Sequence, residues 1–92
     1  MEGFIMETVF FVKSYHYTWR FKGDESFLTP ALALQRAKEL SLMLPDTAVV
    51  SFEAHNWVVY DRGQVVKVYK WEDRYAYDPP SERYEALMEA LK

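Results

Sequence analysis

The sequence contains no cysteine, three glycines and two histidines, and each shortage removes a class of function. Without cysteine the chain has no disulfide, no thiolate ligand for zinc and no cysteine nucleophile. The glycines are well separated, so no glycine-rich loop is available to cradle a phosphate. His16 and His55 fall in a predicted strand and a predicted turn, without the helical i,i+4 spacing typical of a metal site. We therefore expect no metal ion and no cofactor.

The chain also lacks a long apolar run and an excess of positive charge. No stretch approaches the roughly 18 apolar residues of a membrane-spanning helix. The first residues carry acid where a secretory signal carries base, and we expect a cytoplasmic protein with no membrane partner. The formal net charge of −3 provides no concentrated positive field for a phosphate backbone, so nucleic acid is the less favoured partner.

Patterns of catalytic residues are missing as well. None of the five serines stands in the glycine-flanked turn of a hydrolase nucleophile. Adjacent carboxylates occur at residues 24–25 and 72–73, in stretches that we interpret as solvated loops. We expect that the protein is not an enzyme.

Aromatic residues, by contrast, are abundant and make up 17% of the 92 residues. Between residues 15 and 21 rings alternate with polar groups, and a strand sends successive side chains to opposite faces. The rings that share one face of this strand are Tyr15, Tyr17, Trp19 and Phe21. Such a surface is either buried by the chain itself or contacted by a partner. Arg20 and Lys22 give the opposite face a solvated character, so we expect the aromatic row to be inside.

The 92 residues, half of them hydrophobic, are expected to form a single α+β domain over residues 1–92. Residues 1–6 are interpreted as a disordered extension, with Met6 as an alternative start. The predicted elements are an extended segment over 7–22, a turn over 23–26, a helix over 30–44, strands over 48–54, 57–60 and 65–71, and a C-terminal helix that opens within 78–82. Short connections favour antiparallel pairing, which gives the order β-α-β-β-β-α with about four strands and two helices packed on the sheet.

Both helices have clear start signals. Thr29 followed by Pro30 is typical of an N-cap and a first helical position, and the apolar stripe of this helix comprises Ala33, Ala37, Leu40 and Leu44. Asp78 followed by two prolines predicts the cap of the second helix. The apolar stripe of that helix comprises Tyr84, Leu87, Met88 and Leu91.

The two strands after His55-Asn56, which we interpret as a short turn, are predicted to form a hairpin around Gly63. Gly63 fits the left-handed position of a type I turn with a bulge. This turn sets Tyr60 opposite Gln64. Strand alternation then places Trp57 on one face with Val59, Val65, Lys67, Tyr69 and Trp71, and Val58 on the other.

Residues 33–68 resemble small α+β proteins encoded by phages and mobile elements, among them some anti-CRISPR inhibitors. The motifs that carry the resemblance are Leu-Gln-Arg-Ala-Lys-Glu-Leu at 34–40, Val-Ser-Phe-Glu at 50–53 and Trp-Val-Val-Tyr-Asp-Arg-Gly at 57–63. The resemblance implies a non-catalytic inhibitor or regulator that binds a host protein complex.

The aromatic surplus without a catalytic pattern predicts a protein that acts by protein–protein contact, either with a larger complex or by forming a homodimer. The expected contact residues lie on the hairpin and just after it: Trp57, Arg62, Lys67, Tyr69, Trp71, Arg74 and Tyr75. Rings interleaved with basic residues are also typical of single-stranded nucleic-acid platforms. The alternative function is therefore nucleic-acid binding through Lys67, Tyr69, Trp71 and Arg74.

Overall fold

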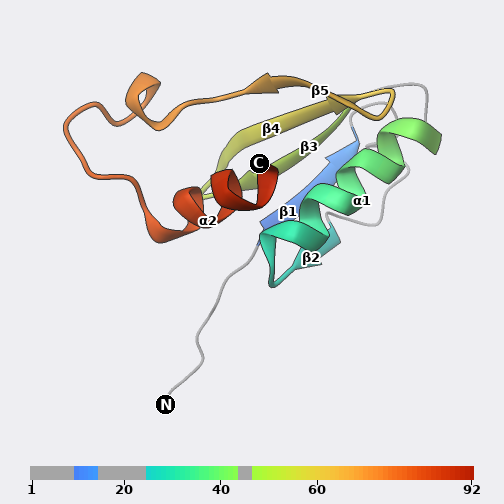
Figure 1. Cartoon of the computed structure of the whole chain (residues 1–92), viewed down its shortest axis with the longest axis horizontal. Coiled ribbons are helices and arrows are strands. Elements are labelled where there is room, and N and C mark those ends of the chain that lie inside the picture. The colour runs from blue at the N-terminus through green and yellow to red at the C-terminus, as the bar shows by residue number, and fades with distance from the viewer. Residues whose placement is uncertain (1–9, 15–24, 44–46) are drawn as a thin grey trace, which may run out of the picture.

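An antiparallel sheet of five strands carries both helices on one side (Figure 1). The computed structural model describes residues 10–14, 25–43 and 47–92. Its elements are β1 (Phe10–Ser14), β2 (Glu25–Phe27), α1 (Pro30–Met43), β3 (Thr47–Phe52), β4 (His55–Asp61), β5 (Gln64–Val68), the short 3-10 helix η2 (Trp71–Asp73) and α2 (Glu82–Leu91). The strands lie in the order β2-β1-β3-β4-β5, and every neighbouring pair is antiparallel. The predicted α+β class is confirmed, with one strand more than the expected four.

The additional strand is β2, which occupies part of the predicted turn over residues 23–26. Phe27 pairs with Phe10 of β1 and packs against the hydrophobic core. Glu25–Phe27 has no β-branched residue, so its own composition carries little strand signal. Pairing with β1, which is distant in sequence, decides its conformation.

Helix α1 begins and packs as the sequence predicts. Thr29 caps it, since the Leu32 backbone amide donates to Thr29 Oγ1 at 3.4 Å. Ala33 and Ala37 are fully buried, and their small side chains let the helix approach β1 and β3 closely. The last helical residue is Met43, and residue 44, which we expected to end the helix, lies outside the described residues.

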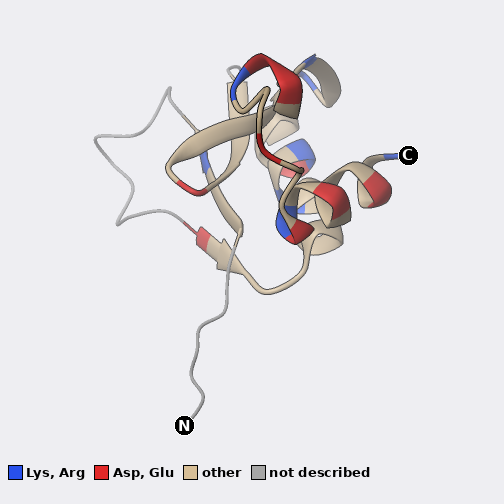
Figure 2. Cartoon of the chain, turned by 90° about the vertical axis from the view of Figure 1, so that its left-hand side faces the viewer, with Lys and Arg blue, Asp and Glu red and all other residues tan. Residues whose placement is uncertain are grey.

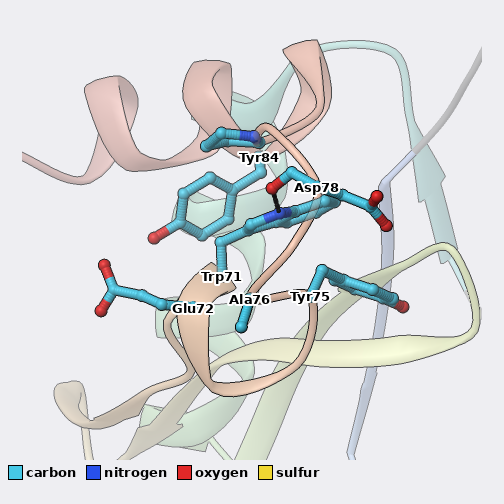
Figure 3. A pocket seen from close by; sticks show the side chains of 7 residues that line it. Trp71, Glu72, Tyr75, Ala76, Asp78 and Tyr84 are labelled. Atoms are coloured by element: carbon cyan, nitrogen blue, oxygen red, sulfur yellow. Dashed lines mark hydrogen bonds between the residues drawn. The ribbon is translucent and has the colours of Figure 1, made fainter.

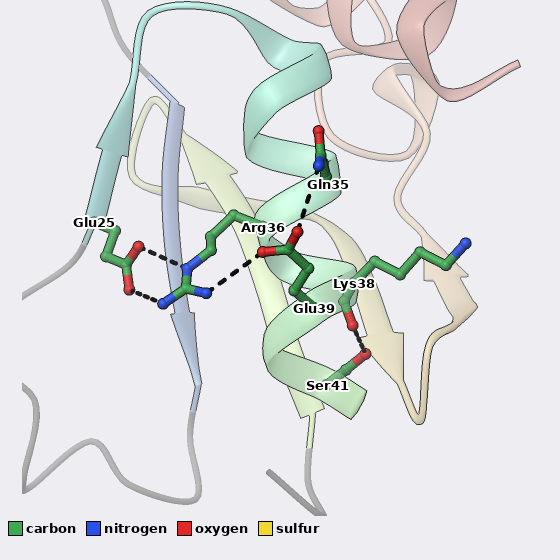
Figure 4. A network of polar contacts seen from close by, with 6 residues as sticks. All are labelled: Glu25, Gln35, Arg36, Lys38, Glu39 and Ser41. Carbon is green, nitrogen blue, oxygen red and sulfur yellow. Dashed lines mark hydrogen bonds and ion pairs between the residues drawn. The ribbon is translucent and has the colours of Figure 1, made fainter. Parts of the chain in front are cut away.

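Polar contacts tie α1 to the edge strand β2 (Figure 4) and to the β4–β5 turn. Arg36 Nε and Nη2 donate to the carboxylate of Glu25 at 2.9 and 3.1 Å, and this hydrogen bonding raises the pKa of Arg36. Further along α1, Ser41 Oγ donates to the Lys38 carbonyl and accepts from the backbone amide of Gly63, each at 2.8 Å. The helix is thereby fixed to β2 and to the β4–β5 turn.

The β3–β4 turn lies at Glu53-Ala54, two residues earlier than the predicted connection at His55-Asn56. These two turn residues have φ angles of 50° and 63°, and such consecutive positive values characterise the tight turn that matches the twist of a hairpin. Neither Glu nor Ala favours the left-handed region. The prediction was wrong because the turn is imposed by strand pairing and not by local composition.

The β4–β5 turn also has two residues, Arg62 and Gly63, with φ angles of 54° and 80°. Tyr60 pairs with Val65 and not with Gln64, so the predicted register was wrong by one residue. The next pair along the strands is Val59 with Lys67, so Val66 is an extra residue that forms a bulge in β5. A turn with both central residues at positive φ replaces the expected type I turn with a bulge, in which only the residue after the central pair has a positive φ.

Helix α2 begins at Glu82, and its cap is Ser81 instead of the predicted Asp78. The backbone amide of Tyr84 donates to Ser81 Oγ at 3.1 Å. Asp78 precedes two prolines, and a residue before proline is held in an extended conformation. The proline pair therefore delays the helix until after Pro80.

Three further predictions fall outside the described residues: the extension over residues 1–6, the aromatic row Tyr15, Tyr17, Trp19 and Phe21, and the extended segment before and after β1. Within the described residues, no helix is both long and apolar enough to cross a membrane.

Candidate functional site

A β-bulge in β4 directs Trp57 into the core. Val50 of β3 pairs with Val58, but the next pair is Ser51 with Asn56, so Trp57 is an extra residue on β4. Trp57 and Val58 are both fully buried and belong to one core cluster. The prediction that these neighbours occupy opposite faces was wrong, because a bulge interrupts strand alternation.

An aromatic stack leads from this core toward the surface. The ring centroid of Trp57 lies 5.0 Å from that of Phe52 and 5.6 Å from that of Trp71, with the ring planes 13° and 12° apart. Tyr84 of α2 lies 5.2 and 5.5 Å from the two indoles, and Tyr75 lies 4.5 Å from Trp71. Each such pair contributes about 0.5–1.5 kcal/mol beyond its buried area. The stack therefore anchors η2 and the loop after it to the end of the sheet.

Hydrogen bonds fix the shape of the loop between η2 and α2. Trp71 Nε1 donates to the carbonyl of Asp78 at 3.0 Å, and the Tyr75 amide donates to the carbonyl of Trp71 at 2.8 Å. The loop thus folds back over Trp71, and these hydrogen bonds hold it there.

Arg74 lies between two aromatic rings on the side of η2 that faces β4. Its guanidinium carbon is 4.7 Å from the centroid of Trp57 and 4.5 Å from that of Tyr69. Arg74 Nη2 also donates to the carbonyl of Asn56 at 2.9 Å, while Lys67 Nζ sits 5.0 Å from the ring of Tyr69. Two of the basic residues expected on the contact surface are therefore already engaged by aromatic rings of their own chain.

Beside Trp71 lies a pocket of about 210 Å³ (Figure 3). We call it the Trp71 pocket, and its lining residues are Trp71, Glu72, Tyr75, Ala76, Asp78, Pro80 and Tyr84. Three aromatic side chains form much of its wall, and the carboxylates of Glu72 and Asp78 lie on opposite sides of Trp71 and point outward. The residues that line the pocket come from η2, the following loop and the first turn of α2.

The end of the molecule that bears the pocket is acidic, as Figure 2 shows for η2, the loop and α2. Residues 72–89 contain six carboxylates and two basic residues. Of these basic residues, Arg74 is held as described above, and Arg83 Nη1 approaches Glu53 at 4.0 Å. Among the described residues, no base forms an ion pair with Glu72 or Asp78. The pocket therefore combines aromatic faces with carboxylates that the described part of the chain leaves unneutralised.

The structure brings most of the predicted contact residues together. Contacts between rings and cations connect Trp57, Lys67, Tyr69, Trp71, Arg74 and Tyr75. Arg62 lies apart from them, exposed in the turn at the other end of β4. Trp57 is fully buried, so it supports the cluster from inside, and Trp71 is only 9% exposed.

Sequence reasoning missed the contributions of Glu72, Asp78 and Tyr84 to the site. Tyr84 lies in the apolar stripe of α2, as predicted, but its approach to Trp71 depends on how α2 packs. The dipeptide Pro79-Pro80 is a local signal for a fixed loop here as well as for the start of a helix.

In the described residues, no group of three or more histidine, aspartate or glutamate side chains is arranged to hold a metal ion. Comparison with known proteins finds no matching family model, and no curated protein or solved structure matches the chain significantly.

Proposed function

We propose that this protein is a non-catalytic binding module that contacts a partner protein through the Trp71 pocket and its acidic rim. The observation that carries the proposal is an open, preformed pocket with three aromatic walls beside carboxylates without a basic partner in the described residues. Tryptophan and tyrosine dominate the energetics of protein interfaces, because they offer large rigid surfaces at low conformational cost.

The partner that fits this surface is a protein with an exposed basic segment. Six carboxylates between residues 72 and 89 give the surface a negative field, and complementary charge steers association and suppresses wrong partners. The predicted regulator of a host complex would act in this way, by occupying a basic surface of that complex.

Single-stranded nucleic acid is less well supported as a partner. Stacking of bases needs free aromatic faces next to free cations. Here Arg74 lies between two rings, and Trp71 is sandwiched by its own chain. The carboxylates of the pocket would also repel a phosphate backbone.

Site-specific photo-crosslinking in the source cells tests the proposal. Tyr77 is fully exposed in the loop that frames the pocket, so p-benzoylphenylalanine in its place preserves an aromatic ring and reports on contacts there. Met43 is 62% exposed at the far end of α1 (Figure 1) and serves as the matched control position. We expect one discrete heterologous adduct from position 77, no such adduct from position 43, and loss of the adduct with Glu72→Lys.

Three outcomes would contradict the proposal. Equal adducts from both positions would show nonspecific contact, and no adduct from position 77 would show that the pocket is not an interface. An adduct of twice the mass of the chain would assign the surface to self-association in place of a different partner.

A further inference from the structure

The Trp71 pocket has the dimensions and the chemistry of a site for a single side chain. Its volume of about 210 Å³ is below the roughly 300–1,000 Å³ of pockets that enclose a drug-sized ligand. One long side chain of a partner, inserted from the surface, therefore matches it better than a free small molecule.

We infer that this side chain is an arginine of the partner protein, an inference that rests on the proposed function of the same surface. An aromatic face attracts a cation placed within about 6 Å of its centroid. Beside the packed indole of Trp71 the pocket offers the rings of Tyr75 and Tyr84, and Glu72 and Asp78 belong to its lining. Together these groups complement the flat faces and the edge donors of a guanidinium.

The chain itself shows the same recognition a short distance away. Arg74 stacks between Trp57 and Tyr69 at 4.7 and 4.5 Å, and its edge donates a hydrogen bond to the Asn56 carbonyl. The pocket likewise combines aromatic rings with acidic residues in one lining.

Arginine fits better than lysine for two physical reasons. Its guanidinium is planar, so it stacks on a ring over its whole face, and it donates to a carboxylate through two parallel hydrogen bonds. A lysine ammonium is a compact and strongly hydrated charge, and it loses more solvation when it enters an aromatic pocket.

The test is an NMR titration of the full chain with the peptide acetyl-Gly-Arg-Gly-amide. The indole N–H of Trp71 donates to Asp78 within the pocket wall, so its resonance reports directly on occupancy. Two further peptides carry lysine, or citrulline, which has the shape of arginine without its charge. We expect a saturable shift with arginine, weaker binding of lysine and no saturable shift with citrulline.

Adjacent carboxylates supply a matched pair of variants. Glu72 lines the pocket whereas Asp73 does not, so Glu72→Gln and Asp73→Asn remove the same charge one residue apart. We expect Glu72→Gln to weaken arginine binding about threefold to fivefold, the range of a partly exposed ion pair, and Asp73→Asn to leave it nearly unchanged.

Equal effects of the two variants, equal binding of citrulline and arginine, or no saturable shift would overturn the inference. Equal binding of lysine would reduce the recognition to charge alone and overturn the assignment of arginine. These results are independent of the crosslinking experiment: an adduct at position 77 without arginine binding would overturn this inference and leave the proposed function standing.

Discussion

The two ends of the sheet are closed in different ways. Under α1 the core is built from small and branched side chains, and the helix buries five residues: Ala33, Leu34, Ala37, Leu40 and Ser41. At the other end the core consists of stacked rings, and α2 buries only Leu87. Small side chains let a helix seal a sheet, whereas large rings hold their neighbours apart and leave an opening. The difference explains why the pocket lies beside Trp71 and why that end is the candidate binding surface.

The largest expected effect tests whether the aromatic end is part of the core. Trp57→Ala removes a fully buried indole that contacts Phe52, Trp71 and Tyr84. We expect the free energy of unfolding to fall by about 3–5 kcal/mol, as measured by urea denaturation. Tyr77→Ala, at a fully exposed ring, is the control and should change stability by less than about 0.5 kcal/mol. Similar losses of unfolding free energy in the two variants would show that the aromatic stack does not contribute to the stability of the core.

Substitutions at two buried serines test how much the contact between α1 and the β4–β5 turn contributes to stability. Ser41 and Ser14 are both 1% exposed. Ser41 Oγ accepts from Gly63, whereas Ser14 Oγ has no hydrogen-bond partner among the residues that the structure describes. We expect Ser41→Ala to cost about 1–3 kcal/mol, because the amide of Gly63 loses its acceptor in a buried position.

Ser14→Ala is the matched variant, and it should be neutral or slightly stabilising, because it removes a hydroxyl that is buried without a partner in the described part of the chain. Chemical denaturation of both variants gives the comparison. Equal losses of stability would mean that the contact between Ser41 and Gly63 does not fix the hairpin to α1.

A smaller effect is expected for the ion pair that joins α1 to β2. Glu25→Gln keeps the size of the side chain but removes the charge that Arg36 contacts at 2.9 Å. Both side chains are about one-third exposed, so we expect a loss of only about 0.2–1 kcal/mol, and a smaller loss at high salt. Denaturation at low and high ionic strength measures it, and a loss that does not change with salt would contradict an electrostatic origin.

The smallest effect appears only at alkaline pH. Burial raises the pKa of the Tyr60 hydroxyl, so folding favours its neutral form. As the pH rises past about 10, the unfolded chain releases this proton first. The stabilisation associated with the neutral Tyr60 hydroxyl is therefore fully present below about pH 10. It is lost as the pH rises through the pKa that Tyr60 has in the folded protein. In Tyr60→Phe we expect a shallower decline of unfolding free energy between about pH 9 and 11, and an unchanged slope would contradict burial of the hydroxyl.

The sequence predicted those parts of the fold that have local causes. Thr29-Pro30 set the start of α1, and the spacing of Ala33 and Ala37 identified its buried side. The antiparallel arrangement followed from short connections. Strand pairing decided the rest: β2 exists because β1 lies beside it, and the turn at Glu53-Ala54 follows from pairing without a local signal.

The candidate site was predictable in its residue types but not in its geometry. Trp71, Arg74 and Tyr75 were identified from the mixture of rings and charges in one stretch. The position of Trp57 was not, because one bulge changed the face that this residue occupies. The approach of Tyr84 to Trp71 brings together two segments that no periodicity relates. The pocket is a property of that packing.

Mapping amide chemical shifts along the chain, with acetyl-Gly-Arg-Gly-amide at saturation, tests the assignment of the binding surface to the aromatic end of the sheet. This assignment predicts that the large shifts lie within residues 71–84 and that α1 and the turn at Gly63 remain unperturbed. Shifts that are centred on the α1 end of the sheet, or spread evenly over both ends, would contradict it.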